Sequence, residues 1–180
     1  MNRFIERMAF IGLTFTLGFL PGCEDHDDEH DPHQGEQHAE GAVEEACEHM
    51  ADGPFEDVSA TATAGDAPSA THEHTAVNIS LVADASSPAD NIGYVTFAAD
   101  EATEFAFYLS TDIPFAVFDA MDTEVLIEES TAVVDCSEVA VEHVADLEVG
   151  TYTLWFGPTI ETMVSLVVEE AGYEEHDGEH

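Results

Sequence analysis

Residues 147–156 read LEVGTYTLWF, and this stretch indicates the fold class most directly. The large apolar side chains of Tyr152, Leu154 and Phe156 occupy every second position, with Thr151 and Thr153 between them. A period of two is typical of a β-strand that buries one face. The glycine-proline pair that follows at 157–158 is a turn signal. We therefore predict a half-buried strand that ends at this turn.

Short segments of the same kind recur along the C-terminal two thirds of the chain. They comprise 75–81, 93–99, 104–111, 115–118, 125–127, 139–141 and 164–168, and a weaker first segment lies within 55–64. Turn residues separate them, and no helical interval intervenes. About seven or eight such strands predict an all-β fold, an antiparallel β-sandwich of jelly-roll or immunoglobulin-like type. We place this domain at residues 55–171.

The N-terminus has the features of a secretory leader. Arg3 and Arg7 precede an apolar run over 8–20, which is shorter than the roughly 20 residues that a membrane span needs. The run ends in Leu20-Pro21-Gly22-Cys23, which resembles the lipobox of bacterial lipoproteins. The resemblance implies that residues 1–22 are a signal peptide and that Cys23 is lipidated, anchoring the protein to a membrane of the bacterial cell envelope, periplasmic or at the outer surface. A plain secreted protein is the alternative.

Composition divides the rest of the chain. Residues 23–41 have almost no apolar side chains, and we predict a disordered acidic tether. Residues 42–54 are predicted to contain a short helix, because Val43, Ala46, Cys47 and Met50 form one apolar stripe. Residues 172–180 are expected to form an acidic, histidine-bearing tail.

Three strands of the predicted sandwich carry a further resemblance. The stretches 104–109 (EFAFYL), 115–119 (FAVFD) and 147–154 (LEVGTYTL) are similar to the recurring strands of bacterial pre-peptidase C-terminal domains. Those domains are small extracellular β-sandwiches. The resemblance implies a non-catalytic accessory or binding module over about residues 76–170.

With Cys23 assigned to lipid, Cys47 and Cys136 remain as an even pair in an oxidising compartment. We predict a disulfide that joins the short helix to the sandwich. A Cys/His metal site with His49 and His143 is the alternative, but the close Cys-x2–4-Cys spacing of structural zinc sites is absent. A Cys136/His143 catalytic dyad is less favoured, since His143 has the parity of a packed histidine at the inner face or edge.

Histidines and carboxylates cluster in three places, which supply eight candidate metal ligands. These are His26, His30, His33 and His38 in the tether, His72 and His74 before the first clear strand, and His176 and His180 in the tail. Imidazole with carboxylate favours Zn²⁺ or Cu²⁺ over Mg²⁺ or Ca²⁺. The sequence predicts weak binding or buffering of several divalent ions.

The charge balance excludes several function classes. The chain has 40 acidic residues against 2 basic ones, a formal charge of -38. Nucleic acid is excluded as a partner, because phosphate neutralisation needs lysine and arginine. No catalytic motif occurs, so no enzymatic activity and no catalytic residue is predicted. The alternative to metal binding is a structural or interaction lipoprotein whose sandwich contacts another envelope protein, with the acidity serving as adaptation to salt.

Overall fold

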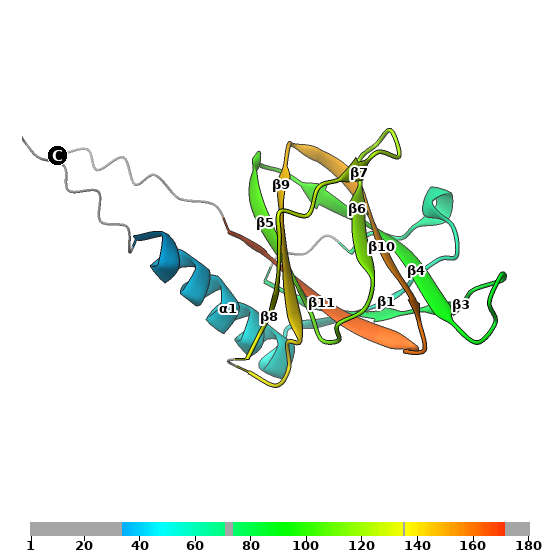
Figure 1. Ribbon diagram of the computed structural model, residues 1–180, viewed down its shortest axis with the longest axis horizontal. Helices are drawn as coiled ribbons and strands as arrows, with labels where there is room; N and C mark the ends of the chain where they lie inside the picture. The colour runs from blue at the N-terminus through cyan, green and yellow to red at the C-terminus, as the bar shows by residue number, and fades with distance from the viewer. Residues whose placement is uncertain (1–33, 71–73, 135, 172–180) are drawn as a thin grey trace, which may run out of the picture. The chain divides into compact units, whose positions relative to one another are not determined.

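The computed structural model describes residues 34–70, 74–134 and 136–171, which form one helix, one short 3-10 turn and two β-sheets (Figure 1). The helix α1 spans Gln34–Asp52 and precedes all the strands. The 3-10 turn η1 spans Ala64–Asp66. The all-β sandwich with a preceding helix is therefore confirmed.

One sheet has six strands in the order β1-β2-β11-β5-β9-β8. These are β1 (Phe55–Ser59), β2 (Ala76–Ser80), β5 (Thr103–Leu109), β8 (Glu129–Ala132), β9 (Val141–Leu147) and β11 (Met163–Glu170). The other sheet has five strands in the order β3-β4-β10-β6-β7. These are β3 (Val82–Ala83), β4 (Asn91–Ala99), β6 (Phe115–Phe118), β7 (Glu124–Val125) and β10 (Gly150–Thr159).

The structure contains more strands than the sequence predicted. The additional ones are edge strands that carry too little apolar alternation to be recognised. β8 reads ESTA and is exposed at every position, and β3 has only two residues. These two strands extend the sheets mainly by backbone hydrogen bonding, whereas hydrophobic periodicity detects side-chain burial. β7 falls at the predicted segment 125–127, and its Val125 packs against the core.

The main core lies between the two sheets. Phe97 of β4 meets Phe105 and Phe107 of β5 edge-on, with ring centroids 5.3 Å and 5.7 Å apart. Leu154 and Phe156 of β10 are fully buried in the same cluster. The period of two at Tyr152, Leu154 and Phe156 thus marks the inward face of β10, at the centre of the five-stranded sheet. The predicted bounds were wrong, because Leu147 belongs to β9 and β10 continues through the glycine-proline pair at 157–158 to Thr159.

Strand β1 departs from the antiparallel expectation, because it pairs with β2 in parallel. The chain between them crosses to the other sheet, where Thr61 bridges Tyr94 and Ser69 bridges Thr96 of β4. After this excursion the chain re-enters the first sheet in the same direction as β1. All the other strand pairs that the structure describes are antiparallel.

A second, smaller core lies outside the sandwich, beneath α1. Ala46 and Met50 of α1 pack with Ala106 and Tyr108 of β5 and Val167 of β11. This packing explains why β5 is buried on both faces from Phe105 to Leu109 although one face of a sandwich sheet usually meets solvent. The helix therefore completes the fold by covering the outer face of the six-stranded sheet.

The predicted start of the helix was wrong. α1 begins at Gln34, whereas the sequence placed residues 23–41 in a tether and started the helix at 42. Residues 34–41 read QGEQHAEG and lack an apolar stripe, but glutamine, glutamate and alanine are good helix formers. Helix propensity, which the apolar pattern ignores, extends the helix over this polar stretch.

The Cys47–Cys136 disulfide is present and fixes α1 to the segment between β8 and β9. The sulfur atoms are 2.06 Å apart and the Cα atoms 6.1 Å apart. The pairing confirms the predicted disulfide. It also excludes the Cys/His metal site and the Cys136/His143 dyad, because neither cysteine retains a thiol.

Candidate metal centre

Most of the predicted lipid and metal residues lie outside the described part of the chain. These are Cys23, His26, His30, His33, His72, His176 and His180; His38 lies in α1, but its side chain is also outside the description. His74 is the predicted ligand that the structure places. It stands next to Glu45, which the sequence did not single out, and His49, which the sequence suggested only as part of the alternative Cys/His site.

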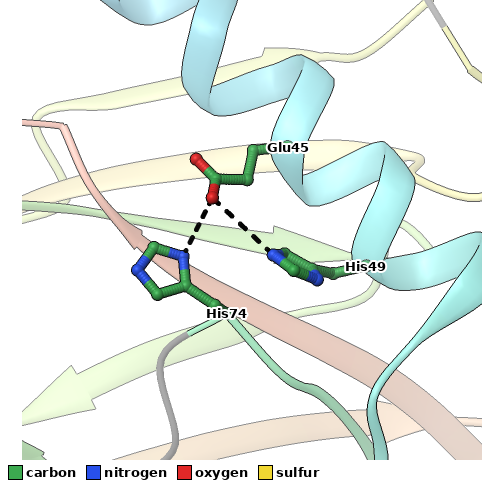
Figure 2. A group of neighbouring side chains, drawn as sticks. All are labelled: Glu45, His49 and His74. Carbon is green, nitrogen blue, oxygen red and sulfur yellow. Dashed lines mark ion pairs between the residues drawn. The ribbon is translucent and has the colours of Figure 1, made fainter.

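Glu45 and His49 come from adjacent turns of α1. Their i, i+4 spacing brings both side chains to one face of the helix. The Oε1 atom of Glu45 lies 3.8 Å from Nε2 of His49 (Figure 2). The Glu45 side chain is half exposed, whereas that of His49 is 17% exposed. The site is therefore accessible to solvent at Glu45 and largely buried at His49.

The hydrogen bonding of His49 determines which ring nitrogen is free to bind a metal ion. Its Nδ1 lies 3.2 Å from the carbonyl oxygen of Gly53, at the end of α1. A carbonyl only accepts, so Nδ1 carries the hydrogen and Nε2 carries the lone pair of the neutral ring. Nε2 is buried and has no hydrogen-bond partner. This is the arrangement of metal-binding histidines, whose second ring nitrogen donates to a carbonyl or carboxylate.

His74 approaches the helix from the segment before β2. Its Nδ1 lies 3.2 Å from Oε1 of Glu45 (Figure 2), and the two imidazole rings of His49 and His74 have centroids 5.8 Å apart. The backbone of His74 has a φ of 52°, a left-handed conformation that costs a non-glycine residue roughly 1–2 kcal/mol. Such conformations persist where surrounding contacts over-determine them, and they concentrate at functional sites.

Glu169 of β11 contacts the cluster through His74. Its Oε2 lies 2.7 Å from Nδ1 of His74, and the residue is only 2% exposed. It follows Val167 on the strand face that α1 covers. Among the described residues it is the one charged side chain buried to this degree. Burial is the main cause that raises the pKa of Tyr108, and the carboxylates of Glu142 and Glu169 raise it further.

Glu45, His49 and His74 have ligand atoms that all lie within 4.8 Å of one another. The sequence contained part of this signal, because the i, i+4 spacing of Glu45 and His49 brings two side chains to one face of a helix. Nothing in the sequence placed His74 beside them, and nothing distinguished Glu169 from its exposed neighbour Glu170.

A second histidine, His143 of β9, lies at the edge of the sandwich. Its ring stacks on Phe115 with centroids 5.1 Å apart, and its Nδ1 lies 2.8 Å from Oγ of Ser130 on the neighbouring strand β8. Burial lowers the pKa of His143, although the nearby Asp112 carboxylate opposes that effect. His143 is thus the packed edge histidine that its parity predicted.

Because the pKa of His143 is lower in the folded chain, the unfolded chain binds more protons as the pH falls through about 6.5. We expect the stabilisation by neutral His143 to be complete above this pH and lost below it. His143→Gln keeps a partner for Ser130 and should lose less stability between pH 7 and 5 than the wild type. Urea unfolding at each pH measures the difference, with His180→Gln as the control. Parallel stability curves for wild type and His143→Gln would contradict this assignment.

Comparison with protein-family models and with curated proteins finds no match for this chain. The similarity to pre-peptidase C-terminal domains and the lipobox therefore stay predictions. In the described residues no helix is long and apolar enough to cross a membrane. The geometry of the Glu45/His49/His74 cluster is the observation on which a function can be argued.

Proposed function

We propose that this protein is a non-catalytic, lipid-anchored protein of the bacterial cell envelope that binds divalent metal ions. The carrying observation is the convergence of Glu45, His49 and His74, two imidazoles and one carboxylate, within 4.8 Å. This donor set suits Zn²⁺ or Cu²⁺ better than Mg²⁺ or Ca²⁺, which prefer oxygen ligands alone. The Nε2 atom of His49, which is buried and has no hydrogen-bond partner, supports the same interpretation.

The surrounding charge supports cation binding in a second way. The chain has no lysine or arginine after Arg7, so no side-chain ammonium or guanidinium competes for the carboxylates of the site. A strongly negative surface raises the local concentration of counter-ions and speeds their association. The His-bearing segments at 23–41 and 172–180 are proposed to hold further ions weakly around the folded site.

The lipid anchor is proposed from the residues 20–23 alone. Acylation of Cys23 would hold the metal-binding domain at a membrane surface in the envelope, with the intervening residues as a spacer. Mass spectrometry of the detergent-extracted protein should show a mature chain that begins at an acylated Cys23. Cys23→Ala should abolish both the acylation and the membrane fractionation.

The metal-binding function can be tested by titrating the full chain with Zn²⁺ by calorimetry, at high NaCl and with excess Mg²⁺ to suppress non-specific binding. We expect one tight site and several weak ones. His49→Ala/His74→Ala should weaken the tight site at least about 100-fold, since loss of even outer-shell partners costs roughly 10–100-fold.

The matched control replaces the predicted ligands of the segments 23–41 and 172–180 by glutamine; these are His26, His30, His33, His38, His176 and His180. We call it the tail variant. This variant should lose the weak sites and keep the tight one. Equal Zn²⁺ binding by the wild type and the His49→Ala/His74→Ala variant would contradict a folded metal site. If the tail variant alone loses binding, the metal function belongs to the tails only.

A further inference from the structure

The three central strands of the five-stranded sheet contain no charged residue. β4, β10 and β6 read NIGYVTFAA, GTYTLWFGPT and FAVF, although 23% of the whole chain is charged. Acids do occur elsewhere on the outward faces of the sandwich. Glu142 and Asp146 alternate with core residues of β9 in the other sheet, and Glu124 occupies the edge strand β7. The outer face of the three central strands is therefore an uncharged area on a strongly acidic protein.

Aromatic side chains occupy the middle of this area. Alternate residues of β4 and β10 are buried in the main core, so Tyr94 and Trp155, which lie between them, point away from it. Tyr94 and Trp155 are register partners on these adjacent strands, and the Cβ atoms of such pairs are about 4.5–5.5 Å apart. Phe118 of β6 points to the same side, because its neighbour Val117 belongs to the main core. We call Tyr94, Trp155 and Phe118 the aromatic platform; its three strands lie side by side in Figure 1.

The aromatic platform is open to solvent and does not serve the packing of the described chain. Its three residues are partly exposed, and none of them belongs to either hydrophobic core of the described residues. Within the same part of the chain, the hydroxyl of Tyr94 and the indole N–H of Trp155 form no hydrogen bond. Thr151 and Thr153 continue the outward face along β10 and add hydroxyl groups. The face thus offers aromatic rings and hydrogen-bonding groups without charge.

Charge narrows the class of ligand that fits this face. Like charges repel, so neither a polyanion nor a second copy of this acidic chain is favoured. A cationic partner is best matched by carboxylates, which β4, β10 and β6 lack. Threonine is under-represented among the residues that dominate the binding energy of protein interfaces, so Thr151 and Thr153 do not favour a protein partner. An uncharged ligand with both apolar surfaces and hydroxyl groups remains.

We propose that the aromatic platform binds an uncharged polysaccharide. The C–H faces of a pyranose ring stack on aromatic rings, and its hydroxyls exchange hydrogen bonds with threonine hydroxyls, the Tyr94 hydroxyl and the Trp155 N–H. The sheet holds these side chains in place before binding, which lowers the entropy lost on association. The site is separate from the proposed metal centre, because α1, which carries Glu45 and His49, packs on the six-stranded sheet.

The fluorescence of Trp155 reports directly on this face, because it is the only tryptophan of the chain. The full chain is titrated in EDTA with three hexasaccharides, made of β-1,4-linked glucose, β-1,4-linked N-acetylglucosamine or α-1,4-linked glucose. We expect at least one of them to shift the emission to the blue in a saturable manner, because a stacked sugar excludes water from the indole. The affinity should be the same within about twofold at about 0.1 and 1 M NaCl, since the contact involves no charge.

Substitutions test whether the aromatic platform is the binding site, with calorimetry as the readout because Trp155 is itself the fluorophore. Tyr94→Ala should weaken the affinity for the oligosaccharide at least about 10-fold, as expected for removal of an aromatic anchor. Trp155→Ala should abolish measurable binding, whereas Trp155→Phe keeps a ring and part of the affinity. Phe55→Ala is the matched control, because it removes a half-exposed aromatic ring from β1 of the other sheet. Far-ultraviolet circular dichroism confirms that each variant is folded.

The proposal is overturned if none of the three oligosaccharides is bound, or if Tyr94→Ala and Trp155→Ala bind as the wild type does. A shift of the Trp155 emission by a lysine-rich peptide instead, reversed by NaCl, would identify the face as a docking site for a cationic protein. A dimer that Trp155→Ala dissociates in sedimentation would identify it as an interface between two copies. Either result would replace the polysaccharide as the occupant, and none of these results bears on the Zn²⁺ titration that tests the metal centre.

Discussion

Removal of the Cys47–Cys136 disulfide is expected to lower the free energy of unfolding by about 2–5 kcal/mol. The bond joins residues 89 positions apart, so it removes a large loop-closure entropy from the unfolded chain. It also restrains α1, which covers the outer face of the six-stranded sheet. The domain has no lysine or arginine with which to form conventional ion pairs, which makes this covalent link more important to its stability.

Urea unfolding of the oxidised and reduced wild type measures the loss. Cys47→Ala/Cys136→Ala should unfold like the reduced wild type and should not respond to reductant, which is the control for solvent effects. Hydrogen exchange should show the loss chiefly in α1, whose contact with the sheet involves only a few apolar side chains, including Ala46 and Met50. An unchanged midpoint after reduction would mean that packing alone holds the helix.

The disulfide also bears on the metal centre, because Cys47 lies between Glu45 and His49 on the same turns of α1. If the helix loosens, the two ligands of α1 are no longer held near His74. Reduction is therefore expected to weaken Zn²⁺ binding together with stability. Preorganisation of ligands by the covalent link is the physical reason.

The second large effect is expected from salt. Raising NaCl from about 0.1 to 1 M shortens the Debye length from about 10 Å to about 3 Å. Two like charges 7 Å apart in water repel by about 0.6 kcal/mol before screening, and the compact state suffers more from such pairs than the unfolded chain does. Summed over the acidic surface, this should raise the melting temperature on the order of 10 °C.

One pair of strands shows where this repulsion acts. Glu104 of β5 is the register partner of Asp146 of β9. The pKa of Glu104 is raised by burial first, and then by the Asp146 and Glu128 carboxylates. Asp146→Asn should therefore stabilise the protein at low salt and reduce its response to NaCl. Sucrose, which does not screen charge, serves as the control.

A flat melting temperature across this range would contradict adaptation of the surface to salt. A steep response in both the wild type and the His49→Ala/His74→Ala variant would show that the effect of salt on stability does not depend on the histidine cluster. The acidic surface would then serve adaptation to salt, and the histidine cluster would serve metal binding. The salt titration thus also tests the alternative function, in which acidity only keeps an interaction module soluble.

The sequence determined the class of fold because a sandwich strand is a local pattern. Tyr152, Leu154 and Phe156 occupy alternate positions of β10, and their burial follows from that alternation whatever they pair with. The disulfide was also predictable, since two cysteines remained once Cys23 was assigned. The start of α1 was not, because residues 34–41 form helix by propensity and carry no apolar stripe.

The candidate metal centre was decided by tertiary structure. Glu45 and His49 are close in sequence, but His74 lies in a segment between strands and Glu169 near the end of the last strand. Only the docking of α1 on β5 and β11 brings these elements together. Burial then makes Glu169 different from Glu170, although the two are adjacent and chemically identical. Composition determines how many carboxylates the chain has, while the packing of α1 over the sheet decides which of them is buried.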